Sequence, residues 1–118
     1  MTEPTDLAKL PGVIPYVDNH NGPRRLLTID VPPVSMNAVR HYVPLTSIDG
    51  RQYVVSWGSV TFEIPADRNV HVSVHLQTNY ASGLTSTPFA SIVLAPHPSP
   101  VRLATRFTNA EGALLPVG

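Results

Sequence analysis

Apolar side chains occupy every second position from residue 70 to residue 77 (VHVSVHLQ), and polar side chains fill the positions between them. A period of two places the two sets on opposite faces of a β-strand. The same period runs through residues 26–31, where Leu27, Ile29 and Val31 share one face. The pattern therefore predicts a half-buried strand in each of these two stretches.

Shorter extended runs lie between turn-forming residues in the rest of the chain. Five more strands are predicted, over residues 36–43, 52–57, 59–64, 89–94 and 101–107. Proline and glycine separate these runs, because neither residue suits the interior of a strand. No stretch shows the period of 3.6 residues that is typical of a helix. The sequence therefore predicts an all-β fold, an antiparallel sandwich of six or seven short strands.

Individual residues mark the connections between these strands. Asp49 and Gly50 predict a two-residue hairpin turn, because a type I′ turn needs positive φ at both central positions. Gly58 predicts a bend or bulge, and Pro44 is expected to interrupt the run over residues 36–43. We therefore assign Asp49, Gly50 and Gly58 structural roles.

The first 23 residues show neither period. They contain four prolines and two glycines, so we expect a flexible head that drapes loosely and is dispensable for folding. The predicted organisation is a proline-bearing head over residues 1–23 and a β-sandwich domain over residues 24–118. A length of 118 residues suits one domain of this kind.

Composition excludes several classes of function. Eight basic and eight acidic residues give a formal net charge of zero, whereas a nucleic-acid-binding surface needs a basic excess, so no nucleic-acid partner is expected. The absence of cysteine rules out disulfides, thiolate metal sites and a cysteine nucleophile. The sequence has no secretory signal pattern and no apolar run of transmembrane length. We therefore expect a cytoplasmic protein by default, with peripheral association with the cell envelope as the alternative.

Five histidines are the main candidates for metal binding. His71 and His75 share one strand face, but four residues of a strand span about 13 Å. Zinc needs its nitrogen ligands at about 2.1 Å from one ion, so these two cannot share it. His20 and His97 are expected in exposed loops, and His41 is expected to be partly buried and hydrogen-bonded. The sequence therefore predicts no metal site and no cofactor.

Motifs of catalysis are missing as well. The chain contains no G-x-S-x-G nucleophile elbow and no glycine-rich phosphate loop before a helix. Glu63 is the only glutamate between Glu3 and Glu111, and its strand position predicts an outward, polar side chain. We therefore expect a protein that is not an enzyme, with a hydrolase or metal enzyme as a remote alternative.

The segment over residues 78–89 is the strongest candidate for binding. It is rich in small residues and holds Leu84 and Phe89 among hydroxyl side chains such as Thr85, with Tyr80 near its start. Functional loops on rigid sandwiches have this composition, although a plain connection between two sheets has it too. Tyr80, Leu84, Thr85 and Phe89 are the predicted interaction residues.

A group of short motifs resembles small uncharacterised actinobacterial proteins of the mycobacterial type. The motifs are MNAV at 36–39, IDG at 48–50, VSWG at 55–58, FEIP at 62–65 and NVHVSV at 69–74. Their rhythm is also similar to PEGA-like surface modules, and this resemblance implies an immunoglobulin-like sandwich. It transfers no activity, because the shared motifs are structural, and the turn after FEIP lacks the glycine that is usual in PEGA-like modules.

These observations together predict a non-enzymatic binding or assembly module that acts through strand edges and a long loop. A protein partner or self-association is expected. The alternative is a β-sandwich that binds a small ligand or a carbohydrate, with Trp57, Tyr53 or Tyr80 in contact with it. Trp57 is expected to fill the core instead, as a tryptophan in a central sandwich strand usually does.

Overall fold

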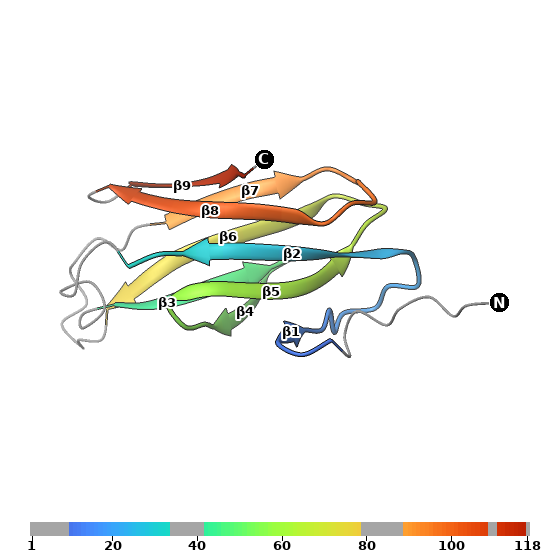
Figure 1. Ribbon diagram of the computed structural model, residues 1–118, viewed down its shortest axis with the longest axis horizontal. Helices are drawn as coiled ribbons and strands as arrows, with labels where there is room; N and C mark the ends of the chain where they lie inside the picture. The colour runs from blue at the N-terminus through green and yellow to red at the C-terminus, as the bar shows by residue number, and fades with distance from the viewer. Residues whose placement is uncertain (1–9, 34–41, 79–88, 109–110, 118) are drawn as a thin grey trace.

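The structure, a computed structural model, describes residues 10–33, 42–78, 89–108 and 111–117. Within these ranges all regular secondary structure is β, which confirms the predicted all-β class (Figure 1). The strands are β1 (Val13–Ile14), β2 (Arg24–Val31), β3 (Tyr42–Ile48), β4 (Arg51–Val54), β5 (Gly58–Pro65), β6 (Val70–Thr78), β7 (Phe89–Leu94), β8 (Val101–Thr108) and β9 (Glu111–Pro116).

The strands form two layers that face each other. Their hydrogen-bonded order is β1-β5-β2-β8-β9-β7-β6-β3-β4. In the view of Figure 1, β5, β2 and β8 form the front layer, and β6, β3 and β4 lie behind it. β9 pairs along its length with β8 and meets β7 at one register pair, Phe89 with Glu111. The fold is therefore a sandwich in which one continuous sheet folds over at β9.

Strand pairing differs in two ways from the predicted antiparallel sandwich of six or seven strands. Three pairs are parallel: β1 with β5, β2 with β8, and β7 with β9. The two additional strands, β1 and β9, come from the head and the tail, where the sequence shows no clear alternation. Their pairing depends on partners far away in the chain, so a local pattern does not predict it.

The core lies between the two layers and follows the predicted alternation. The inward side chains of β2 and β6 are buried, namely Leu27, Ile29 and Val31 from β2, and Val70, Val72, Val74 and Leu76 from β6. Phe62 of β5 and Leu103 of β8 are fully buried against them. Each such side chain contributes roughly 1.5–3 kcal/mol of burial free energy, so the core stabilises the sandwich. The outer faces of the two layers are the surfaces that can contact a partner.

The hairpin between β3 and β4 has the predicted turn. Asp49 has a φ of 49° and Gly50 a φ of 87°, so both central residues are left-handed as a type I′ turn requires. Most of the strand predicted over residues 36–43 lies outside the described residues. The prediction that Pro44 ends a strand is wrong, because Pro44 lies inside β3. Its carbonyl accepts a hydrogen bond from the backbone N–H of Val55 at 3.1 Å. The proline nitrogen therefore faces the same side, beyond the end of β4, and no ladder bond to β6 is lost.

Residues 10–23 lie against the sandwich, which differs from the loosely draped head that the sequence suggests. β1 pairs with β5, and Tyr16 is only 7% exposed and belongs to the core cluster. Individual side chains, and not strand alternation, hold this segment. That is why its sequence shows no period.

Candidate functional site

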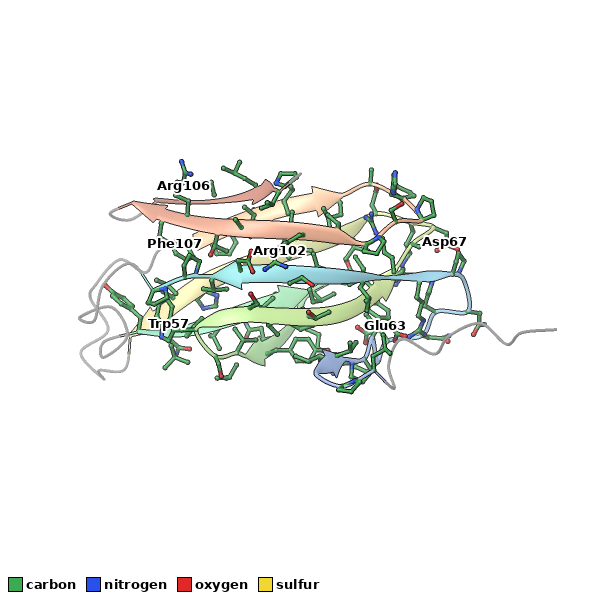
Figure 2. All side chains as sticks on the ribbon, in the orientation of Figure 1. Trp57, Glu63, Asp67, Arg102, Arg106 and Phe107 are labelled. Carbon is green, nitrogen blue, oxygen red and sulfur yellow. The ribbon has the colours of Figure 1, made fainter. Side chains whose placement is uncertain are left out.

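The outer face of the β5-β2-β8 layer carries charged and hydroxyl side chains that bond to one another. Arg102 binds Asp30 through two hydrogen bonds, from Nε at 2.8 Å and from Nη2 at 2.7 Å (Figure 2). Ser59 donates a third hydrogen bond to the same carboxylate. These hydrogen bonds lower the pKa of Asp30, and those from Arg102 have the largest effect. This face is therefore internally satisfied and solvated.

The outer face of the β7-β6-β3-β4 layer has a different composition. Its outward positions are Phe89, Ser91 and Val93 on β7, His71, Ser73, His75 and Gln77 on β6, Val43, Leu45 and Ser47 on β3, and Gln52 and Val54 on β4. None of these described positions is Asp, Glu, Lys or Arg, and we name this surface the uncharged face. Depletion of charge is the compositional mark of the centre of a protein–protein interface.

Several apolar side chains of the uncharged face are open to solvent. Val54 is 74% exposed, Val93 58% and Phe89 51%. The ring of Phe89 lies beside that of His75, its cross-strand neighbour, with 6.4 Å between the centroids. Apolar side chains that are this exposed and share one sheet face are typical of a surface that is covered in a complex.

A polar network at one end of the sandwich fixes the head. The hydroxyl of Tyr16 donates to Asp49 Oδ2 at 2.9 Å and accepts from Arg68. The guanidinium groups of Arg24 and Arg68 lie 5.8 and 5.6 Å from the centre of the tyrosine ring. Burial, followed by the hydrogen bond to Asp49, raises the pKa of Tyr16. The hydroxyl of Tyr16 is bonded to both Asp49 and Arg68, so we assign Tyr16 a structural role.

Glu63 lies in the same network, and the prediction of an outward polar side chain is wrong. Its position on β5 does face away from the core, but residues 10–23 cover it, so the carboxylate is buried (Figure 2). It forms an ion pair with Arg24 and accepts the backbone N–H of Tyr16 at 3.2 Å. Arg24 also donates to the backbone carbonyls of Tyr16 and His20, at 3.1 and 2.9 Å. Loss of either partner would leave an uncompensated buried charge, so the carboxylate is committed to this pair and is not free for acid–base chemistry.

The predicted interaction residues are only partly described. Phe89 lies at the start of β7, whereas Tyr80, Leu84 and Thr85 lie outside the described residues, as does His41. The part of the predicted loop that the structure describes therefore ends on the uncharged face.

Trp57 and Tyr53, the aromatic residues considered for ligand stacking, both pack on the core. Trp57 is half-buried and lies against the core cluster. Tyr53 stacks on Phe62 with 5.3 Å between the ring centroids. Gly58, directly after Trp57, has a φ of 112°, so the predicted bend occurs at a position that favours glycine.

The histidines fall into different environments. His71 and His75 point outward from β6, and His97 lies in the exposed turn after β7. The side chain of His20 is buried, contrary to the prediction, and its Nε2 lies 3.1 Å from Asp67 Oδ1. The described residues contain no group of three or more His, Asp or Glu side chains that could hold a metal ion.

Comparison with known proteins returned no match, whether to a family model, to a curated protein or to a solved structure. In the described residues, no helix has the length and apolar character needed to cross a membrane. The uncharged face could not be predicted from the sequence, because its residues come from four strands whose neighbours only the fold defines. Each strand taken alone shows that its outward positions carry no charge, but only the strand order shows that these positions form one surface.

Proposed function

We propose that this protein is a non-enzymatic binding and assembly module whose uncharged face docks onto the same face of a second copy. The observation that carries the proposal is the contrast between the two outer faces. One face holds the Arg102–Asp30 pair with its hydroxyl partners, and the other holds exposed Phe89, Val93 and Val54 without a formal charge.

A second copy is the occupant that the charges favour. A surface without charge offers no field to attract a basic or acidic partner, and the whole chain has a formal net charge of zero. Two copies therefore meet with little electrostatic repulsion, which favours self-association. A two-fold dimer also needs only one such surface, because each copy contributes the same patch.

The size of the uncharged face sets the expected affinity. Four strands about 4.8 Å apart, with five or six residues at about 3.3 Å each, give a patch of roughly 20 by 20 Å. Such a patch measures about 400 Å² per copy, or about 800 Å² for the pair, which is below the size of most stable interfaces and suits a weak, transient one. We therefore expect a reversible dimer with a dissociation constant in the range of about 1–100 μM.

The open edges of the sheet are less suited to binding than the sequence suggested. The terminal strands β1 and β4 contain two and four residues. Side chains also connect them to their surroundings: Arg51 of β4 binds Asp18 at 2.7 Å. Short and obstructed edges offer few backbone groups for strand addition. The proposed module therefore binds through a face.

Strand order supports the immunoglobulin-like part of the proposal. Strands β5-β2 in one layer and β7-β6-β3-β4 in the other correspond to the E-B and G-F-C-C′ arrangements of immunoglobulin-like sandwiches. The module departs from them where β8, a late strand, runs parallel to β2. We retain the relationship to PEGA-like modules as part of the same proposal.

Light scattering on charge variants tests the proposed function. Val93→Lys and Val54→Lys each place a charge on the uncharged face, so a dimer of the unmodified protein should become a monomer. Asn69→Lys adds the same charge in the exposed turn before β6 and should leave the dimer unchanged. If Val93→Lys and Val54→Lys dimerise as well as Asn69→Lys does, the interface is not this face.

A further inference from the structure

Arg25 occupies a position where the pattern of its strand calls for an apolar side chain. It precedes Leu27, Ile29 and Val31 in the inward phase of β2 and is only 5% exposed. A charge that is removed from water is costly unless an anion or several hydrogen bonds compensate it. Arg25 therefore needs a partner.

None of the carboxylate side chains that the structure describes supplies that partner. There are five of them, and each is paired with a different basic side chain: Asp18 with Arg51, Asp30 with Arg102, Asp49 with Arg68, Glu63 with Arg24, and Asp67 with His20. The guanidinium of Arg25 instead donates to the backbone carbonyl of Ala95 at 2.9 Å and, more weakly, to that of Ser99 at 3.4 Å. Its Nε has no hydrogen-bond partner within the described ranges. Burial lowers the pKa of Arg25, as expected when its charge is not compensated.

The turn between β7 and β8 forms a cavity over this guanidinium. The cavity has a volume of about 350 Å³ and is lined by Arg25, Leu94, Pro96, His97, Pro100 and Val101, together with Ala95. Its walls are apolar except for the guanidinium and the imidazole. Prolines stiffen the turn, so the cavity is shaped before a ligand binds.

His97 is the second polar side chain that lines the cavity. Its Nδ1 accepts the backbone N–H of Ser99 at 3.0 Å, and this places the proton of the neutral ring on Nε2. The backbone N–H of His97 bonds to the carbonyl of Ala66 at 2.9 Å and fixes the residue in place. A guanidinium and an imidazole therefore border one largely apolar cavity.

We propose that this cavity binds a small organic carboxylate, with the carboxylate on Arg25 and His97 and an apolar substituent against the proline and leucine walls. One guanidinium matches a monoanion. A phosphate dianion would need a further cation, and the neighbouring Arg24 is already paired with Glu63. Charge-assisted hydrogen bonds to a carboxylate are among the strong interactions that arginine forms.

Thermal unfolding with benzoate as the probe tests this site. For a dissociation constant near 1 mM, about 20 mM benzoate should raise the Tm of the unmodified protein by about 5 °C or more. Arg25→Met, which keeps an extended side chain without charge, should abolish the rise. Arg106→Gln is the matched control, because Arg106 is exposed and forms no ion pair with any side chain that the structure describes; it should keep the full rise.

Further arms keep the proposal falsifiable if Arg25→Met fails to fold. His97→Ala lies in an exposed turn and should weaken benzoate binding about 10-fold, measured by NMR titration of the backbone amides around the cavity. The proposal is wrong if benzoate shifts His97→Ala and the unmodified protein equally, or shifts neither. It is equally wrong if inorganic phosphate at the same ionic strength produces the same rise in Tm, because the effect is then one of salt.

Discussion

Truncation of Tyr16 tests whether the head is part of the folded domain. Tyr16→Ala removes a side chain that is almost fully buried among core residues and whose hydroxyl bonds to Asp49 and Arg68. Replacing a buried aromatic side chain by alanine costs about 3–5 kcal/mol. For 118 residues, an unfolding entropy of about 2.1 cal/mol/K per residue gives about 0.25 kcal/mol/K. The expected fall in Tm is therefore about 12–20 °C.

Two further variants separate the contributions of the ring and the hydroxyl. Tyr16→Phe keeps the ring and loses the hydrogen bonds to Asp49 and Arg68, so we expect a loss of about 1 kcal/mol, or about 4 °C. Val17→Ala, at an exposed neighbouring position, should stay within about 0.5 kcal/mol of the unmodified protein. Calorimetry and urea unfolding measure all three. A loss below about 1 kcal/mol for Tyr16→Ala would show that the head is not anchored and is dispensable, as the sequence suggested.

Alkaline pH provides an independent check on the same residue. The pKa of Tyr16 is raised in the folded protein, mainly by burial. The unfolded chain therefore releases this proton first, and the associated stability is present below the ordinary pKa of about 10 and is lost as pH rises through the folded value. The Tm of Tyr16→Phe should fall less steeply above pH 10 than that of the unmodified protein. It should still fall, because burial also raises the pKa of Tyr53.

Three other predictions follow from single residues. Thr46 is fully buried and its hydroxyl has no hydrogen-bond partner in the described structure. Thr46→Val should therefore increase the free energy of unfolding by about 1 kcal/mol, measured as a higher urea midpoint, and an unchanged midpoint would contradict this. At Gly112 a Cβ would stand 2.6 Å from the ring of Phe107 and 2.8 Å from the carbonyl of Phe89, so Gly112→Ala should cost about 1–3 kcal/mol in urea unfolding, and wild-type stability would refute the close approach of β9. The pKa of Asp30 is lowered by Arg102, so its contribution is present above the unfolded pKa of about 3.9 and is lost as pH falls through the lower folded value. Asp30→Asn should therefore lower Tm at pH 7 and converge with the unmodified protein near pH 2; a difference that is the same at both pH values would exclude the ion pair as its source.

Local sequence pattern predicted those parts of the fold that local physics determines. The alternation in β6 fixes which side chains enter the core, and Asp49-Gly50 has the positive φ angles that its hairpin requires. β1 and β9 were not predicted, because their sequences show no alternation, and the parallel pairs of β1 with β5 and of β7 with β9 join segments that are separated in the chain. Pro44 was misjudged for a similar reason, since its place in β3 depends on where β4 ends.

The candidate surfaces were harder to predict than the fold. Phe89 was identified from composition, but the rest of the uncharged face comes from β6, β3 and β4 as well as β7, and these strands share one face only through strand order. Arg25 is visible in the sequence as a charge in the inward phase of β2. Its lack of an anionic partner is evident only because the five described carboxylate side chains pair with other residues, and that pairing is a property of the folded chain.

Sedimentation equilibrium of the unmodified protein tests the central claim, that the uncharged face joins two copies, most directly. Between about 1 and 300 μM, the account predicts an average mass that rises from that of the 12.8 kDa chain toward twice that value. The curve should fit a monomer–dimer equilibrium with a dissociation constant of about 1–100 μM. A mass that stays at that of the single chain across the whole range would contradict the claim.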